Sequence, residues 1–254
     1  MPEKTTHPPS IKDIPASAWK KLSKKRIYFG HQSVGNNIID GINDLMKENL
    51  EIKLNIFRTA DPNDFKVGVF AHSSIGKNDD PQSKINAFAD FMNKGIGNNA
   101  DIAFFKFCFA DIIGTTDVND VFNAYRKTLS DLKKKYSNTT FIHVTVPLVI
   151  TKKSIKSRLK RMLGKKDIWF YEGNIKRNEL NKLILDEYNG REPVFDLAEI
   201  ESTHSGGKRE IFKEGANTYY AMVPAFTKDA GHLNEEGRKR AAEQLLILLV
   251  TLSK

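Results

Sequence analysis

A serine near the start of the chain and an aspartate–histidine pair near its end are the residues best suited to nucleophilic chemistry. Ser33 lies in "RIYFGHQSVGNNIIDGI", between a strand-like run and a helix-like run, and Asp229 and His232 lie in "KDAGHLNEEG". At this spacing the carboxylate can bind Nδ1 of the imidazole and leave Nε2 free to take a proton from a serine hydroxyl. The three residues therefore predict a nucleophile, a general base and a group that orients the base.

Other functions explain these loops less well. Gly30 and Gly35 have the spacing of a phosphate-binding GxxxxGK[ST] loop, but asparagines stand where that loop needs its lysine and its hydroxyl. An α/β-hydrolase would carry GxSxG in mid-chain, and here His31 stands in place of the first glycine. A simple turn would explain Ser33 alone, but it leaves the aspartate–histidine pair unexplained.

The elements that must position these residues alternate between strands and helices. Strands are expected at residues 26–29, 51–59, 101–109, 139–148 and 193–198, and helices at residues 36–50, 82–94, 118–136, 174–188 and 235–249. This order predicts a parallel sheet with helices on both faces, a three-layer α/β sandwich. Ligands of such a sheet bind beyond the carboxyl ends of its strands, where Ser33 falls.

A single domain is expected over residues 25–254, after a polar tail or linker over residues 1–24. Asn234 is the expected N-cap of the last helix. We expect His143 in the core or at the sheet edge, and the amine of Lys106 at the end of its strand. Irregular loops are expected over residues 60–81, 151–171 and 201–228.

Composition restricts the classes of function. The hydrophobic fraction of 40% suffices for a buried core. The formal charge of +9 favours anionic partners, but the sequence has no basic stripe interleaved with aromatic residues, so nucleic acid is a disfavoured partner. No run of the sequence reaches the length of a membrane span. The first residues lack the apolar stretch of a signal peptide, and we favour an exported protein whose signal was removed over a cytoplasmic one.

Metal and redox motifs are absent from the sequence. Cys108 is the single cysteine, which excludes CxxC motifs and an intrachain disulfide. No HxxxH or HExxH spacing occurs among the scattered histidines His31, His72, His143 and His204. We therefore expect no metal and no cofactor.

Two segments resemble conserved blocks of the SGNH (GDSL-like) hydrolases. "FGHQSVGNNIIDGI" is similar to the first block of that family, and "DAGHLNEEGRKRAAEQL" is similar to its last, D-x-x-H block. The resemblance extends over the chain from Arg26 onward. It implies a flavodoxin-like three-layer sandwich and ester chemistry, with Ser33 as nucleophile, His232 as general base and Asp229 as the group that orients it.

The chain departs from the family pattern at the oxyanion hole. "HQS" replaces "GDS", and Ala110 stands where the third block, G-x-N-D, has its oxyanion-binding asparagine. The glycine of the second block corresponds to Gly76, so the resemblance implies a hole formed by the backbone N–H groups of Ser33 and Gly76. The candidates for a substitute side chain are Asn78, Asn36, His72 and His31. Loss of one donor without replacement lowers the rate about a hundred- to a thousandfold.

The resemblance implies a serine esterase or deacylase that acts through an acyl-enzyme. We expect its substrate to be a carbohydrate O-acetyl or similar ester, either a small molecule or a polysaccharide, and an acidic polymer would suit the charge of +9. Two alternatives stay open. One is an O-acyltransferase that uses a sugar hydroxyl instead of water, and the other is a non-catalytic carbohydrate-binding domain with a decayed oxyanion hole.

Overall fold

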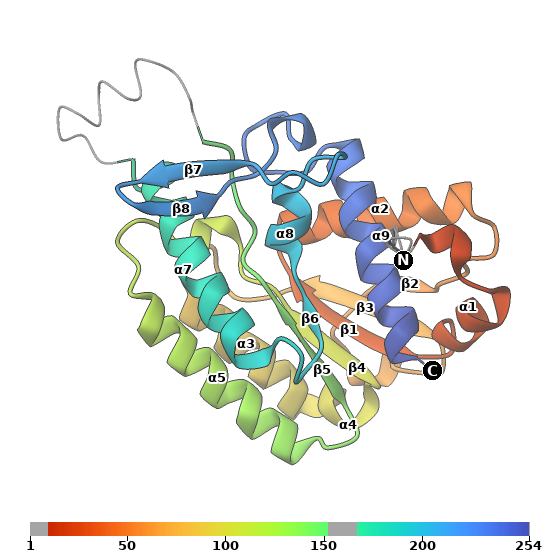
Figure 1. Cartoon of the computed structure of the whole chain (residues 1–254). Coiled ribbons are helices and arrows are strands. Elements are labelled where there is room, and N and C mark those ends of the chain that lie inside the picture. The colour runs from red at the N-terminus through yellow and green to blue at the C-terminus, as the bar shows by residue number, and fades with distance from the viewer. Residues whose placement is uncertain (1–9, 152–166, 254) are drawn as a thin grey trace, which may run out of the picture.

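A parallel six-stranded sheet forms the middle layer of the fold (Figure 1). The computed structural model describes residues 10–151 and 167–253. Within them the strands lie in the order β2 (Ile56–Arg58), β3 (Val69–Ser74), β1 (Arg26–His31), β4 (Ile102–Phe105), β5 (Thr140–Val144) and β6 (Val194–Phe195). Each neighbouring pair is parallel, and crossover connections, most of them helical, join the successive strands.

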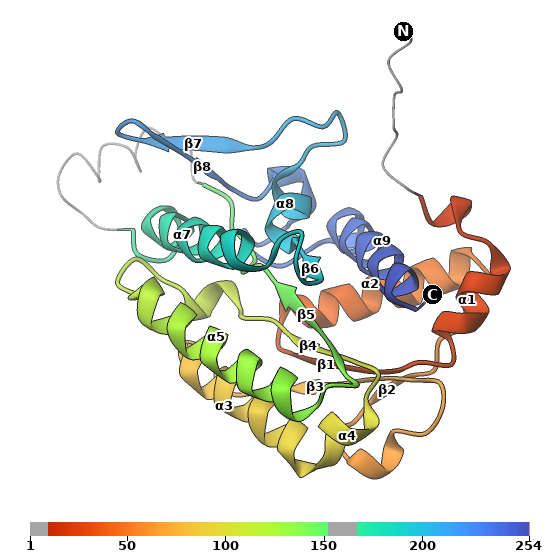
Figure 2. The ribbon, with the colours of Figure 1, turned by 60° about the horizontal axis from the view of Figure 1, so that its bottom comes forward.

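Helices cover both faces of the sheet, as Figure 2 shows from its edge. One layer contains α1 (Ala16–Leu22), α2 (Val34–Glu48), α8 (Leu197–Ser202) and α9 (Glu235–Leu252). The other contains α3 (Pro81–Phe91), α5 (Val118–Lys135) and α7 (Tyr171–Tyr188), and a π-helical turn (Met92–Ile96) and α4 (Gly97–Asn99) follow α3. The predicted three-layer α/β sandwich is confirmed.

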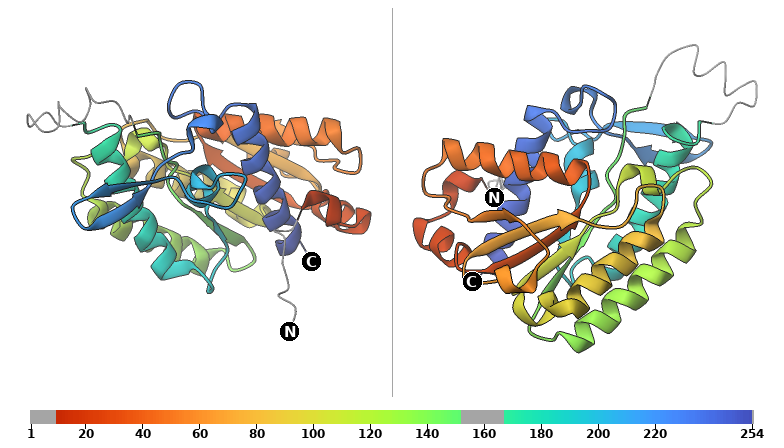
Figure 3. Two further views of the ribbon diagram at one scale, coloured as in Figure 1. Left: turned by 45° about the horizontal axis from the view of Figure 1, so that its top comes forward. Right: turned by 180° about the vertical axis from the view of Figure 1, so that it is seen from behind.

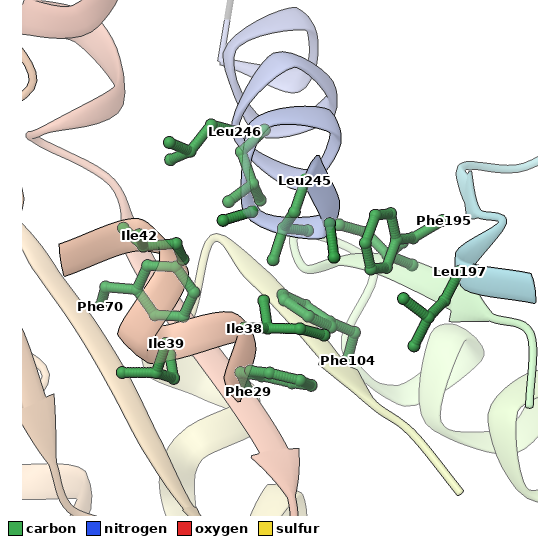
Figure 4. Packing of buried hydrophobic residues seen from close by; sticks show 14 of the residues in the cluster. Phe29, Ile38, Ile39, Ile42, Phe70, Phe104, Phe195, Leu197, Leu245 and Leu246 are labelled. Atoms are coloured by element: carbon green, nitrogen blue, oxygen red, sulfur yellow. The ribbon is translucent and has the colours of Figure 1, made fainter. Parts of the chain in front are cut away.

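Alternate side chains of β1 enter two apolar clusters, one on each face of the sheet. Ile27 and Phe29 belong to the cluster beneath α2 and α9, and Tyr28 belongs to the cluster above α3 and α5. Figure 4 shows the first cluster, in which the rings of Phe29 and Phe104 stack with centroids 4.6 Å apart. Burial on both faces explains why the central strands read as continuous apolar runs.

Helices α2 and α9 pack directly against each other (Figure 3). A Cβ at Gly41 would lie 2.3 Å from the carbonyl oxygen of Arg238, so the two backbones approach as closely as only glycine permits. Arg238 also forms an ion pair with Asp44 at 2.7 Å. This contact joins the helix that follows Ser33 to the helix that follows His232.

The central strand β3 was not expected, because it lies within residues 60–81, which we predicted to be irregular. Its apolar run, Val69 to Ala71, is short, and a histidine and two serines follow it. Its pairing with β1 and β2 therefore defines it better than its own pattern does. The strands β2, β4 and β5 are shorter than predicted, and the polypeptide beyond β4 leaves the sheet toward the site.

The expected tail over residues 1–24 is wrong for residues 10–24. A short 3-10 helix (Ile11–Asp13) and α1 pack against α9, and Trp19 and Leu22 are buried in the core. Lysines surround these apolar residues in the sequence, which hides the helical pattern. Residues 1–9 lie outside the described part of the chain.

The loops on the rim contain more regular structure than expected. Residues 201–228 include an antiparallel hairpin, β7 (Ile211–Glu214) and β8 (Asn217–Tyr220), which lies along α7 (Figure 3). Most of the insert expected over residues 151–171 lies outside the described residues. In the part of the chain that the structure describes, each helix is too short or too polar to cross a membrane.

Candidate active site

Ser33 lies in the turn between β1 and α2, at the carboxyl end of the sheet (Figure 1). Its φ of 40° and ψ of −99° lie outside the regions that non-glycine residues favour. A conformation of this kind costs about 1–3 kcal/mol and is found mainly at functional sites. It holds Oγ at the N-terminus of α2, where the Val34 N–H donates to it at 2.7 Å. The positive end of the helix dipole stabilises negative charge at this place.

The side chains of Ser33, His232 and Asp229 form a continuous chain of hydrogen bonds. The Oγ of Ser33 lies 3.0 Å from Nε2 of His232, and Nδ1 of His232 lies 2.6 Å from Oδ2 of Asp229. A neutral imidazole protonated on Nδ1 satisfies both contacts, because it donates to the carboxylate and accepts from the hydroxyl. Such an arrangement can activate a serine hydroxyl as a nucleophile.

The Asp229 carboxylate is held by a tight turn. Its Oδ1 accepts hydrogen bonds from the backbone N–H groups of Gly231 and His232, at 3.1 and 2.8 Å. Partial burial raises the pKa of this carboxyl, but the hydrogen bonds from these two N–H groups and from the imidazole outweigh burial and lower the pKa to about 2. Asp229 is therefore ionised at neutral pH and can orient the imidazole.

Two side chains that the sequence analysis did not single out hold the histidine loop in place. The N–H of Leu233 donates to Oδ1 of Asn37 at 3.1 Å, which ties this loop to α2. The ring of Phe109 meets the imidazole of His232 edge-on, with centroids 5.4 Å apart. Asn234 caps α9 through its side chain, as predicted. Asn37 and Phe109 have no local signal because their contacts join distant segments.

The backbone N–H groups of Ser33 and Gly76 lie on the loops that follow β1 and β3, at the carboxyl end of the sheet. Among the hydrogen bonds that the described residues form with one another, none uses either N–H group. The Nε2 of Gln32 donates to the carbonyl oxygens of Ile75 and Gly76, at 2.8 and 2.6 Å, and so joins the two loops. Gly76 has a φ of 51°, and a Cβ there would lie 2.6 Å from the backbone nitrogen of Lys84. Only glycine fits this position.

The two asparagines proposed as oxyanion donors, Asn78 and Asn36, differ in their surroundings. Asn78 lies on the loop after β3, is exposed, and accepts a hydrogen bond on Oδ1 from the buried Lys84 at 3.0 Å. Asn36 is exposed in the first turn of α2, and its side chain bonds to no other described residue. Ala110 lies in a 3-10 helix after β4 (Phe109–Asp111) and contributes no polar side chain.

His31 and His72, the two histidines among the candidate oxyanion donors, are buried. His31 has no exposed surface, and its Nε2 lies 2.9 Å from Nδ1 of His72. A Cβ at Gly35 would lie 2.3 Å from the His31 ring, which places this ring directly beneath the first turn of α2. The alternation of β1 explains the outcome, because His31 shares the α2 face of the sheet with Phe29.

Two further polar residues singled out from the sequence, His143 and Lys106, are buried. His143 stacks on Tyr188 with ring centroids 3.4 Å apart and lies 2.8 Å from the Tyr125 hydroxyl, which confirms its core position. Lys106 is wholly buried, and its Nζ donates to the carbonyl oxygen of Phe107 at 3.1 Å. Within residues 10–151 and 167–253, no group of three or more His, Cys, Asp or Glu side chains could hold a metal ion.

The buried histidines predict a loss of stability in mild acid. Burial lowers the pKa of His31 to about 2, that of His143 to about 4, and also that of His72. The unfolded chain binds protons at these positions below pH about 6.5, whereas the folded protein does not. The free energy of unfolding therefore falls as the pH decreases through this value, by about 1.4 kcal/mol per pH unit for each fully neutral histidine.

Glu201 reduces this loss of stability in acid. Burial raises its pKa to about 8, so the folded state retains a proton that the unfolded chain loses. We expect a net loss of about 2 kcal/mol between pH 6.5 and pH 5, measured by urea unfolding at the two values. The variant His143→Phe should lose about 1.5 kcal/mol less than the wild type over this interval. Equal midpoints for the wild type at the two pH values would contradict the prediction.

Comparison with known proteins relates this geometry to a known fold. No protein-family model and no curated protein sequence matches the chain. The structure is similar to that of a GDSL-like lipase from Bacteroides thetaiotaomicron, with a TM-score of 0.51, 13% sequence identity, and 90% of this chain and 89% of the other covered. The chain has the SGNH hydrolase fold. Its structure is also similar to the periplasmic domain of the lipopolysaccharide acetyltransferase of Salmonella ser. Paratyphi A, with a TM-score of 0.50, 14% identity, and 89% and 84% coverage.

Within this SGNH fold, Ser33 follows the first strand, and Asp229 and His232 precede the last helix.

Proposed function

We propose that this chain is a serine esterase of the SGNH type that removes an O-acetyl or similar short acyl group from a carbohydrate. The observation that carries the proposal is the hydrogen-bonded chain from Oγ of Ser33 through His232 to Asp229. The strained backbone of the serine supports the same chemistry, and so do the N–H groups of Ser33 and Gly76, which bond to no other described residue.

In the first half of the reaction, Oγ of Ser33 attacks the ester carbonyl carbon, and the hydroxyl proton passes to Nε2 of His232. The carbonyl electrons move onto oxygen, where the N–H groups of Ser33 and Gly76 stabilise the negative charge. The tetrahedral intermediate then collapses. The C–O bond to the sugar breaks, and the sugar oxygen takes the proton from His232.

In the second half, water gives a proton to His232 and attacks the acyl carbon on Ser33. Collapse of this intermediate breaks the bond to Oγ, which recovers the proton, and the carboxylic acid leaves. Asp229, with a pKa of about 2, stays ionised and stabilises the imidazolium form of His232 in both halves.

The substrate class is inferred from charge and exposure. The side chains of His232 and Asp229 are 42% and 56% exposed, so a large substrate could reach the triad. The formal charge of +9 favours an acidic polymer. O-acyl transfer is the second candidate, because an open site admits a sugar hydroxyl as well as water, and one similar structure is that of a lipopolysaccharide acetyltransferase.

Labelling with a fluorophosphonate tests the proposed nucleophile. We expect the probe to attach to the wild-type protein at Ser33, located by peptide mass spectrometry, and we expect hydrolysis of p-nitrophenyl acetate above the rate without protein. An acetylated sugar acceptor formed in place of acetate would favour transfer. A folded protein that shows neither labelling nor turnover would overturn the esterase proposal and leave the non-catalytic carbohydrate-binding domain.

A further inference from the structure

We propose that the Asn78 amide is the third oxyanion donor, and that the buried ion pair between Lys84 and Asp111 is the device that positions it. Asn78 would thereby replace the asparagine that is missing at Ala110. This inference rests on the proposed esterase function. It adds Lys84 and Asp111 as two positioning residues.

The orientation of the Asn78 amide follows from its partner. The Nζ of Lys84 lies 3.0 Å from Oδ1 of Asn78 and 2.6 Å from Oδ2 of Asp111, and the lysine side chain has no exposed surface. An ammonium group only donates hydrogen bonds, so the amide atom that faces it must be the carbonyl oxygen. The NH₂ group of Asn78 then points away from Lys84, and among the described residues it meets no acceptor.

Asp111 fixes the ion pair to the two loops that follow β3 and β4. Its Oδ2 accepts from the backbone N–H of Cys108 at 2.6 Å, and its Oδ1 accepts from the backbone N–H of Asp79 at 3.1 Å. Asp79 has a φ of 66°, in the left-handed region that aspartate adopts more readily than most non-glycine residues. The backbone next to Asn78 is thus held by the same carboxylate that binds Lys84.

The loop that carries Asn78 also carries Gly76, and Gln32 joins that loop to the residue before Ser33. The start of α3 packs so closely on Gly76 that a Cβ would meet the backbone of Lys84. The three expected donors, the N–H groups of Ser33 and Gly76 and the amide of Asn78, therefore belong to one connected unit. A buried ion pair often adds little to the net stability of a fold. Positioning of the Asn78 amide would give the ion pair between Lys84 and Asp111 a function.

Kinetics of p-nitrophenyl acetate hydrolysis test the inference. We expect Asn78→Ala to lower kcat about 10²- to 10³-fold with little change in KM, because the amide would bind the oxyanion and not the substrate carbonyl. Asn86→Ala is the matched control, because Asn86 is exposed on α3 and, among the described residues, its side chain bonds only to Gln82. Its kcat should equal that of the wild type.

The double variant Lys84→Met/Asp111→Asn tests the positioning function, because it removes both buried charges together and retains an acceptor for Cys108. We expect a folded protein by circular dichroism, with kcat lowered about a hundredfold by misplacement of the amide. Adding Asn78→Ala to this variant should then lower kcat little further.

Three outcomes would separately contradict the esterase function, the role of Asn78 and the role of the ion pair. A wild type without labelling or turnover removes the esterase function and this inference with it. An active wild type in which Asn78→Ala retains full kcat overturns the assignment of Asn78. Full kcat in a double variant whose Tm alone has changed would show that the ion pair is structural only.

Discussion

Replacing Ser33 with alanine is expected to lower kcat for p-nitrophenyl acetate by about 10⁴- to 10⁶-fold, the largest effect that we anticipate from a single substitution. Without Oγ no acyl-enzyme can form, and only binding and the oxyanion donors remain to accelerate direct attack by water. The same variant should lose all labelling by the fluorophosphonate. Both readouts must change together, because they report the same oxygen atom.

The fold should survive this substitution. Alanine removes the hydrogen bonds from Oγ to His232 and to the N–H of Val34, but the side chain is small and only half-buried. Ser137→Ala, at an exposed position in the turn after α5, serves as the control and should retain full activity. Continued labelling of the Ser33→Ala variant would mean that another residue is the nucleophile.

The substitution Asp229→Asn is expected to lower kcat about 10⁴-fold. The asparagine oxygen can still accept from the N–H groups of Gly231 and His232, so the turn should retain its shape. The side chain would carry no charge to stabilise the imidazolium, and its NH₂ group could favour the wrong tautomer of His232. The decrease in kcat would therefore come from the missing charge and the wrong tautomer, and the fold would stay intact.

Measurement of kcat and of the circular dichroism spectrum separates these effects. Asp90→Asn, at an exposed position on α3, is the matched control and should have wild-type activity. A loss of less than tenfold in Asp229→Asn would mean that the carboxylate does little in catalysis, and the triad would reduce to Ser33 and His232.

The sequence predicted those features of the fold and of the candidate site that a local pattern of residue types defines. The spacing of Asp229 and His232, and the serine after the first apolar run, predicted a triad whose members lie within hydrogen-bond distance in the structure. The alternation of apolar runs predicted the layers of the fold. Both inferences need only residue types and their order along the chain.

The features that the sequence did not predict share a physical cause, because each depends on contacts between distant segments. β3 is defined by its pairing with β1. Lys84 reads as one more lysine on a helix, and only the folded chain shows that its amine is wholly buried against Asp111. Asn78 and His31 were both named as oxyanion donors, with Asn78 the first choice, and no local pattern shows that the side chain of His31 is buried and that of Asn78 exposed.

The close packing of α2 against α9 has a consequence for when activity can arise during synthesis. Ser33 leaves the ribosome before the strands β2 to β6, whereas Asp229 and His232 follow all six strands and lie immediately before α9. The strands β1 to β6 are all complete by then, so a nascent chain can contain the whole sheet and its strained serine without a general base. For the proposed esterase, docking of α9 onto α2 at Gly41 would then be the event that completes the triad. A chain that stalls before this helix would contain the sheet and the serine but no triad.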